Sequence, residues 1–576
     1  MARNHLLIGV CVSSLAVGCQ SDFALGESDQ GTGSTAGSEH SITSPSSSTG
    51  ESPVTDGSIS GTETSGESNG KTSSGSSSSE VSATTTNMSS SSTSLTGSAT
   101  GDSTVATASS DTDASSTGGA DTRGANTGGA DTGGATTCGD GVVAGGEDCD
   151  DGNVVSFDGC SSGCVAEGPI VQICAGTART CVVDGQGRLK CWGANLYGEL
   201  GIGGMEHVGD DPGEMGADLP FVDVGMKVDA IACRQNFCAL GTEGQVKCWG
   251  GPTGPYLGLG TTEAIGDDPG EMGDALATVE LGEPALQIAN APRGACAFLA
   301  SGALKCWGFN ESGQLGVGDT QVKGDEPGEM GLDLPAVNLG QLKPVQIVRG
   351  HHQNCAFDAG GNIKCWGKGQ LLGLESAENR GDQPGEMGNM LPFIDLGAGA
   401  KVAQASATSG HVCVVLVDGR LKCWGEDNGS NVLWPFGSQM VWYGWEPGQM
   451  GDNLPAYDLG EHNAVAVEAG DGSSCVLLDD QSVKCWGYAG QGIMGTGSPA
   501  PWLGDPLDKV PAIDLGAGEV VTQVSHGYYH ACALLASGRV KCWGANLAGE
   551  LGYEDDNNRG DEPGEMGDAL PFVEVF

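Results

Sequence analysis

The stretch LKCWGANLYGELG, residues 189–201, returns almost unchanged as VKCWGANLAGELG, residues 540–552. Its centre, KCWG, occurs seven times at spacings of 57 to 62 residues and ends at Gly193, Gly250, Gly308, Gly367, Gly425, Gly487 and Gly544. Repetition at such an interval indicates an array of equivalent supersecondary units. We therefore expect the part of the chain that contains these copies to fold as a repeat domain.

Each copy holds several short apolar runs, such as PVQIVRG (residues 344–350), a run with CAL or CVV, the KCWG run, and LPFVDVG (residues 219–225). Their β-branched and aromatic residues, separated by Gly and Pro, predict antiparallel strands. Four strands in each of seven copies predict an all-β fold, a seven-bladed β-propeller over residues 168–576. The array opens with PIVQICAG and ends with LPFVEVF, so we expect these two runs to share one blade and close the ring.

The phrase WG-x-N-x-x-G-x-LG is complete in copies one, three and seven, at Asn195, Asn310 and Asn546. With the strands around it, this phrase resembles the repeat of the regulator of chromosome condensation family, and the resemblance implies a propeller. The founding activity of that family is nucleotide exchange on a nuclear GTPase, whereas other members act by binding, including a secreted propeller that inhibits β-lactamase. For an exported chain, the resemblance implies a binding role rather than nucleotide exchange.

Cysteines recur in pairs ten residues apart in every copy. Residues facing each other across an antiparallel pair have Cα atoms about 4.5 to 5.5 Å apart, a separation that a disulfide accepts. We therefore predict one disulfide within each blade, and expect the neighbouring Trp to point to the opposite face and pack between blades. The predicted pairs are Cys181 with Cys191, Cys238 with Cys248, Cys296 with Cys306, Cys355 with Cys365, Cys413 with Cys423, Cys475 with Cys485, and Cys532 with Cys542.

Two further cysteines, Cys174 and Cys233, precede the pairs of copies one and two. A bridge between neighbouring blades and a pair of free buried thiols both remain open for them.

The N-terminus carries a positive residue, Arg3, and an apolar run over residues 6–18 that is too short to span a bilayer, which predicts a signal peptide over residues 1–19. The run ends in AVG before Cys19 and resembles a bacterial lipobox, which implies a lipid on Cys19. Gln20 after the cysteine implies the outer membrane, with the protein at the cell surface. Ordinary secretory cleavage nearby, giving a secreted protein, is the alternative.

Residues 20–137 are almost entirely Ser, Thr, Gly, Ala and Asp, which predicts a disordered linker. Residues 138–167 resemble the cysteine-rich repeat of myxobacterial-type surface proteins. The cysteines in this segment predict two disulfides of undetermined connectivity among Cys138, Cys149, Cys160 and Cys164. Its oxygen-bearing side chains would suit calcium, although Asp-Gly and Gly-Asn also simply form tight turns; the candidate ligands are Asp140, Asp150, Asp151, Asn153 and Asp158.

The formal charge of -49 argues against a nucleic-acid partner and against direct binding to an anionic membrane, so we expect membrane contact only through the N-terminal lipid. The sequence shows no catalytic triad, phosphate loop or zinc-helix motif, so we predict no enzyme activity, no cofactor apart from the calcium considered above, and no obligate oligomer. The favoured function is a cell-surface lipoprotein that binds an extracellular protein or glycan. An enzyme inhibitor, a structural coat protein and a glycan-acting enzyme are the alternatives.

Aromatic residues concentrate in the loop of copy five, NVLWPFGSQMVWYGWEPGQMG. Such residues often anchor interfaces and stack on sugar rings, although the loop could instead pack on itself. The candidate ligand-binding residues are Trp434, Phe436, Trp442, Tyr443 and Trp445. A second candidate is the ring of turns before the first Cys of each pair, which collects Arg179, Arg234, Arg293, His351, His352, His411, Tyr528, Tyr529 and His530.

Replacing Cys19 with Ala should release the protein from membranes, because the residue that would carry the lipid is then missing. Membrane fractionation of cells expressing either form measures this. If the unchanged protein is found in solution with its N-terminus cut at another residue, the lipobox interpretation is wrong.

Overall fold

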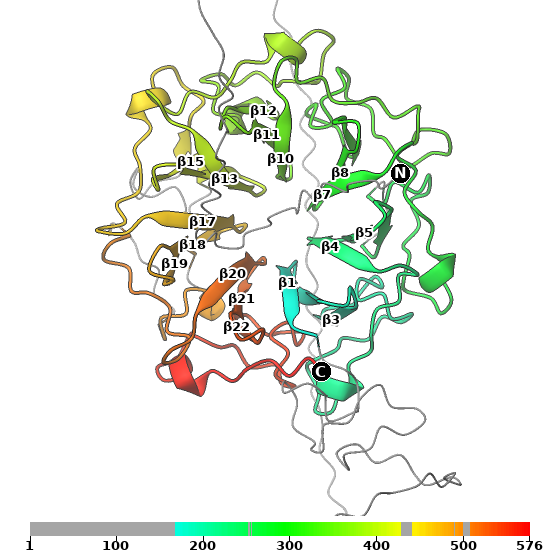
Figure 1. Cartoon of the computed structure of the whole chain (residues 1–576), viewed down its shortest axis with the longest axis vertical. Helices are drawn as coiled ribbons and strands as arrows, with labels where there is room; N and C mark the ends of the chain where they lie inside the picture. The colour runs from blue at the N-terminus through cyan, green and yellow to red at the C-terminus, as the bar shows by residue number, and fades with distance from the viewer. Residues whose placement is uncertain (1–167, 252–253, 255, 428–440, 489, 499–506) are drawn as a thin grey trace, which may run out of the picture. The chain divides into compact units, whose positions relative to one another are not determined.

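The structure, a computed structural model, describes residues 168–251, 254, 256–427, 441–488, 490–498 and 507–576. These residues form β-strands and short 3₁₀ helices, which confirms the predicted all-β class. The strands make seven antiparallel sheets, one per repeat, around a common centre (Figure 1). No helix in this part of the chain has the length and hydrophobicity needed to cross a bilayer.

We number the sheets 1 to 7 in chain order. They consist of β1 (Ile170–Ala175), β2 (Arg179–Asp184) and β3 (Leu189–Gly193); β4 (Val228–Cys233), β5 (Phe237–Gly241) and β6 (Val246–Trp249); β7 (Ala285–Ala291), β8 (Gly294–Leu299) and β9 (Leu304–Gly308); β10 (Pro344–Arg349), β11 (Gln353–Asp358) and β12 (Ile363–Gly367); β13 (Val402–Ala407), β14 (His411–Leu416), β15 (Leu421–Asp427) and β16 (Val441–Tyr443); β17 (Ala464–Ala469), β18 (Ser473–Leu478) and β19 (Val483–Gly487); β20 (Val521–His526), β21 (His530–Leu535) and β22 (Val540–Gly544). The 3₁₀ helices are η1 (Gly216–Asp218), η2 (Gly273–Ala275), η3 (Gly369–Leu371), η4 (Gly388–Met390), η5 (Gly451–Asn453), η6 (Gly490–Gly492) and η7 (Gly567–Ala569).

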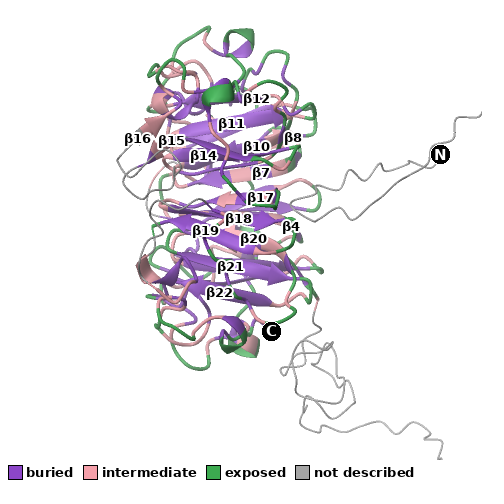
Figure 2. Ribbon diagram, turned by 90° about the vertical axis from the view of Figure 1, so that its left-hand side faces the viewer, coloured by how far each residue is buried: buried purple, intermediate pink, exposed green. Residues whose placement is uncertain are grey.

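In every sheet the first strand lies nearest the centre, and the KCWG strand lies third, farther out (Figure 1). The strands are buried almost throughout, while the loops carry most of the exposed residues (Figure 2). The predicted fourth strand is much reduced. In sheet 1 the LPFVDV run contributes one backbone hydrogen bond, from Val222 to Leu189, and the other six repeats contain the same bond. Pro220 lacks an N–H group, as do the prolines at this position in five other repeats, so the run does not extend the ladder.

The prediction that the two ends of the array share a blade is wrong. β1 pairs with β2 of its own repeat, and the N–H of Val573 donates to Val540, also within its own repeat. Sheets 7 and 1 instead meet side by side. The side chain of Gln523 accepts from the N–H of Ile173 (3.2 Å) and donates to its carbonyl (3.1 Å). Gln172 bonds Ile231 in the same way between sheets 1 and 2, so these two junctions are built alike.

The structure bonds all seven pairs of cysteines that lie ten residues apart. The two residues of each pair face each other on the second and third strands, with Cα–Cα distances of 4.0 to 4.1 Å. All fourteen of these cysteines are at most 1% exposed. The open question about the remaining two is also answered, because Cys174 and Cys233 form a disulfide that links sheet 1 to sheet 2.

The Trp of KCWG packs between sheets, as expected from its position next to the Cys. Trp192 is fully buried, and its Nε1 donates to the carbonyl of Glu550 in repeat seven (3.1 Å). Trp249 donates in the same way to Glu199 of repeat one (3.0 Å). Each of these indoles therefore ties its sheet to the preceding repeat.

The Lys of KCWG has a role that the sequence did not suggest. Lys305 lies within sheet 3, and its Nζ donates to Leu281 of repeat two (2.9 Å) and to Gly331 of its own repeat. The equivalent Lys in repeats one, four, five and seven likewise bonds one carbonyl of the preceding repeat and one of its own. Since strand residues two apart face the same side, Lys and Trp reach toward the same neighbour.

Replacing Lys541 with Met should destabilise the domain by about 2 to 3 kcal/mol, because the buried carbonyls of Leu515 and Gly567 each lose a donor. Urea unfolding of the purified protein measures this. The matched control is Lys343→Met at an exposed lysine, which should change the free energy of unfolding by less than about 0.5 kcal/mol. Equal effects of the two substitutions would contradict a clamping role for Lys541.

Candidate binding face

The turns between first and second strands lie at the same end of the sheets as the loops that leave the KCWG strands, because neighbouring strands are antiparallel. We call the surface formed by these turns and loops the turn face. Its turns are residues 176–178, 234–236, 292–293, 350–352, 408–410, 470–472 and 527–529. In repeat three, Arg293 of the turn lies over the ring of Phe309 in the loop, with 5.2 Å from Cζ to the ring centroid.

Aromatic side chains from separate repeats gather on the turn face. Tyr488, Tyr528 and Tyr529 are 44%, 37% and 40% exposed, and each contacts another of the three. The ring centroids of Tyr488 and Tyr529 lie 5.7 Å apart, and those of Tyr528 and Tyr529 lie 4.3 Å apart with perpendicular planes. We call these three residues the tyrosine cluster. Tyr256 and Phe309 form a second contact at 5.6 Å, from repeats two and three.

The loops of repeats one and seven add exposed apolar surface to the same face. Leu196 and Tyr197 of repeat one are 57% and 45% exposed, and Leu547 of repeat seven is 71% exposed. Exposed apolar groups that gather on one surface are typical of an interaction site.

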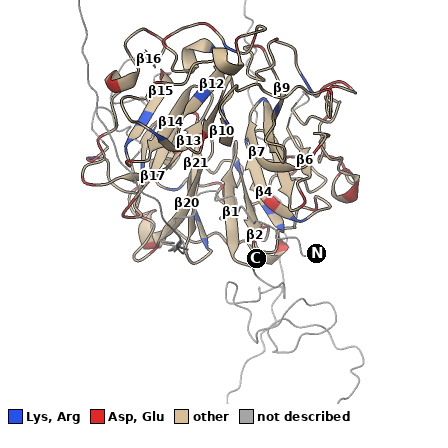
Figure 3. Ribbon diagram, turned by 45° about the horizontal axis from the view of Figure 1, so that its top comes forward, with Lys and Arg blue, Asp and Glu red and all other residues tan. Residues whose placement is uncertain are grey.

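Basic groups of the turn face are engaged by neighbouring groups. Arg293 pairs with Glu311 at 3.2 Å, and Lys368 lies 5.0 Å from the ring centroid of Trp442. Arg234 of repeat two reaches the carbonyl of Ala469 in sheet 6 at 3.3 Å. Acidic residues are prominent in the outer loops, while several Lys and Arg residues lie on strands nearer the centre (Figure 3).

Two carboxylates of repeat six lie close to Arg234. Burial raises the pKa of Glu468 to about 7, against the opposing effect of Arg234. Burial alone would also raise the pKa of Asp471, but Arg234 and two hydrogen bonds from Ser409 hold it below its usual range. The centre of the turn face therefore combines one guanidinium with two partly buried acids.

Several of the predicted ring residues are structural. His411 is buried and bonds Ser474 of the next sheet at 2.9 Å, and His530 bonds Thr180 of sheet 1 at 3.0 Å. Arg179 forms a buried ion pair with Glu199 at 2.9 Å. By contrast, Arg234, Arg293, His351, His352, Tyr528 and Tyr529 are at least partly exposed.

The aromatic loop of repeat five is described only in part. Trp434 and Phe436 lie outside the described residues, while Trp442, Tyr443 and Trp445 are half-buried. Trp442 pairs with Glu426 as β16 extends sheet 5, and Tyr443 packs against the cores of the neighbouring sheets. This loop thus continues the sheet while its Trp442 takes part in the turn face. Sequence reasoning missed Tyr256, Phe309, Lys368 and Tyr488, because their proximity to these turns depends on contacts between separate segments of the chain.

The structure does not test the calcium site predicted from the sequence, because its candidate ligands lie outside the described residues. The candidate calcium ligands Asp140, Asp150, Asp151, Asn153 and Asp158, with Cys138, Cys149, Cys160, Cys164 and Cys19, lie outside the described residues. In the acidic loop GDDPGEMG of repeat one, residues 209–216, the carboxylate of Glu214 accepts from the N–H groups of Gly209 (2.8 Å) and Asp211 (3.1 Å). The exposed groups of His462, Asp479 and Asp480 lie within 4.8 Å of one another and provide only three ligand atoms.

Comparisons with known proteins agree with the repeat pattern. Residues 170–199 and 521–550 match the Regulator of chromosome condensation (RCC1) repeat, and residues 135–165 match a domain of unknown function (DUF4215). The chain is 25% identical over 382 residues to the E3 ubiquitin-protein ligase HERC2 of Homo sapiens, covering 65% of this chain and 7% of HERC2. It is 25% identical over 265 residues to the Ultraviolet-B receptor UVR8 of Arabidopsis thaliana, covering 45% of this chain and 52% of UVR8. It therefore spans less than two thirds of either relative.

Another relative is Protein RCC2 of Homo sapiens, 24% identical over 400 residues, covering 65% of this chain and 68% of RCC2. Among solved structures, human WBSCR16 aligns with a TM-score of 0.49 and 18% identity, covering 66% of this chain and 97% of that chain.

Lowering the pH from 7 to 5 should weaken the domain through its buried histidines. Burial holds the pKa of His411 at about 4, below the value near 6.5 of an unfolded chain. Between these two values the unfolded chain binds more protons, so the free energy of unfolding falls as the pH falls, by about 1 to 2 kcal/mol for this residue. In urea unfolding, His411→Gln should lose less stability than the original protein between pH 7 and pH 5.

Between pH 8 and pH 7 the two proteins should respond almost alike, because the histidine is mainly neutral in both folded and unfolded chains. If the free energies of unfolding of the two proteins fall in parallel down to pH 5, His411 is not kept neutral by burial.

Proposed function

The chain is an RCC1-repeat protein, and from this premise we propose that it binds a partner through the turn face and carries out no catalysis. The observation that carries the proposal is the tyrosine cluster, whose three rings come from two repeats and are each more than a third exposed. Tyrosine buries a large apolar area while keeping a hydroxyl for hydrogen bonding, and it is enriched at interface hot spots. Trp442, with its neighbours Tyr443 and Trp445 in the loop of repeat five, extends this binding surface.

The partner we propose is an extracellular protein with a basic surface. The chain has a formal charge of -49, and acidic residues are prominent in its outer loops (Figure 3). Such a field attracts cationic partners and raises their association rate, while the exposed rings of the tyrosine cluster supply contact area. A glycan is the other ligand class that stacks on tyrosine and tryptophan rings, and the experiment below distinguishes it from a protein.

We place this binding domain at the cell surface, anchored through a lipid on Cys19 and held out by the linker of residues 20–137. The disulfides support an oxidising compartment, because eight of them occur in the described residues and such bonds rarely persist in a reducing cytoplasm. We do not assign the ligase activity in the name of HERC2 to this chain, since the match covers only 7% of that protein.

Replacing Tyr488, Tyr528 and Tyr529 together with Ser should abolish or strongly weaken binding. The full chain and the triple variant would be screened on arrays of basic extracellular proteins and of glycans, and hits measured in solution. We expect at least about a tenfold rise in Kd, since losing interface anchors costs more than about 1.4 kcal/mol. The melting temperature should change little, because these side chains are partly exposed.

The matched control replaces Leu332 and Met390 with Ser, since these apolar residues are 91% and 74% exposed but lie in the outer loops. Loss of binding in this control, or unchanged binding in the tyrosine variant, would refute the turn face as the site. Hits confined to the glycan array would refute the protein partner and support a glycan.

A further inference from the structure

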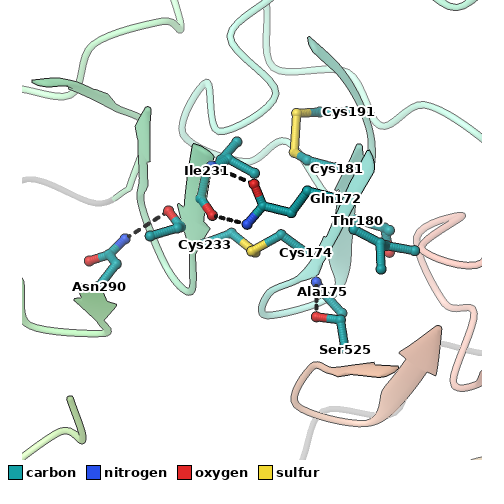
Figure 4. Close-up of a disulfide and its surroundings, with 12 residues drawn as sticks. Gln172, Cys174, Ala175, Thr180, Cys181, Cys191, Ile231, Cys233, Asn290 and Ser525 are labelled. Atoms are coloured by element: carbon teal, nitrogen blue, oxygen red, sulfur yellow. Dashed lines mark hydrogen bonds between the residues drawn. A yellow bond between two sulfur atoms is a disulfide. The ribbon is translucent and has the colours of Figure 1, made fainter. Parts of the chain in front are cut away.

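The bridge between Cys174 and Cys233 differs from every other disulfide in the described part of the chain. It joins two sheets, and its two cysteines are 59 positions apart in the sequence, whereas the other seven each join neighbouring strands of one sheet (Figure 4). It also differs in access to solvent. Cys174 is partly exposed and Cys233 is 5% exposed, while the fourteen cysteines of the other pairs are at most 1% exposed.

Equivalent junctions hold together without a covalent bond. Between sheets 7 and 1, Oγ of Ser525 accepts from the N–H of Ala175 at 2.8 Å, as Figure 4 shows. Between sheets 5 and 6, Oγ of Ser406 accepts from the N–H of Ala469 at 3.0 Å. The strand registers place Cys174 at the position of these two serines and Cys233 at the position of the two alanines.

The junction between sheets 1 and 2, which the bridge spans, also has its own hydrogen bonds. Gln172 donates to and accepts from the backbone of Ile231, both at 2.9 Å (Figure 4). The disulfide is therefore an addition to a junction that polar contacts already hold, and its opening leaves these contacts in place.

The bridge fastens a turn of the turn face. Cys233 ends β4, and residues 234–236 follow it directly. Arg234 accepts a hydrogen bond at its carbonyl from the N–H of Thr177 in repeat one (3.1 Å), and its guanidinium bonds Ala469 of repeat six. Sheets 1, 2 and 6 therefore meet at this residue, next to the disulfide.

We propose that the Cys174–Cys233 bridge is a site of thiol–disulfide exchange in the folded protein, opened by dithiol reductants while the seven disulfides within sheets stay closed. A thiolate of the reductant attacks the sulfur of Cys174, the bond between the cysteines breaks, and Cys233 leaves as a thiolate that takes up a proton. The second thiol of the reductant then displaces Cys174, so two electrons pass from the dithiol to the bridge. The reductant leaves as its own disulfide.

Opening the bridge frees the turn at residues 234–236 without unfolding the sheets. This proposal does not depend on the proposed binding function, because the chemistry requires only access to the bridge.

The test treats the folded full chain with increasing dithiothreitol in the absence of denaturant, alkylates free thiols, and maps them by mass spectrometry. Within residues 168–576, Cys174 and Cys233 should be labelled first, at least about tenfold faster than any cysteine of the other seven pairs, since exchange rates follow access. Tryptophan fluorescence should stay native while this happens. Hydrogen exchange at residues 234–236 should rise on reduction.

The matched variant is Cys174→Ser with Cys233→Ala, which reproduces the Ser and Ala found at the junctions of sheets 5 and 6 and of sheets 7 and 1. This variant should fold, and no cysteine of residues 168–576 should be alkylated early. Hydrogen exchange at residues 234–236 should be as fast in the variant as in the reduced protein. Opening of a within-sheet pair at the same reductant concentration would overturn the proposal, as would a bridge that opens only when fluorescence reports unfolding.

Discussion

A buried ammonium group joins the sheets of this protein. The Lys of KCWG sits on the outer strand of its sheet, and in five repeats its Nζ bonds a carbonyl of the preceding repeat and one of its own. A buried charge is tolerated only when its donors are satisfied. At Lys190, Lys364 and Lys541 the ring of a Phe from the LPF run also lies within 5 Å of the ammonium. The Trp two residues later reaches the same neighbour, so a single strand supplies both of these contacts to the junction.

The sequence predicts whatever depends on a few neighbouring residues. The turn between second and third strands sets the register of Cys181 and Cys191, so a ten-residue spacing is enough to infer their bond. The predicted fourth strand, the LPFVDVG run, is shorter than expected. Its apolar residues suggest a strand, but Pro220 removes a donor that a ladder needs.

The sequence placed the Trp of KCWG between blades, but it did not identify the partners in the neighbouring repeat. Trp192 and its acceptor Glu550 are 358 residues apart, and no local pattern pairs them. The bridge from Cys174 to Cys233 was left open for a related reason. The second cysteine falls one position farther along its strand than the first, since Cys174 faces Cys181 while Ala232 faces Cys238.

The candidate site also combines residues that the sequence reveals with residues that only the packing of the repeats brings together. Histidines and three arginines before the paired cysteines were visible in the sequence, but only the packing separates the structural residues, such as His411, from the partly exposed ones, such as His351. Tyr488 was not noticed, because it becomes part of a cluster only when repeat six lies against the turn of repeat seven. The framework is therefore repeated in each copy, and the residues that differ between copies give the turn face its chemistry.

The contact between the first and last sheets affects the order in which the protein can acquire its structure. Lys190 finds its acceptor on Val575, 385 residues later, and Trp192 finds its own on Glu550. Each sheet can form from local sequence as the chain emerges, but the ammonium of Lys190 and the indole of Trp192 lack these protein acceptors until the last repeat arrives. Contacts of such long sequence separation form slowly and leave apolar surface open to association. In the export proposed above, the chain would cross the membrane from its N-terminus, so the step that protects the first repeat would come at the end of translocation.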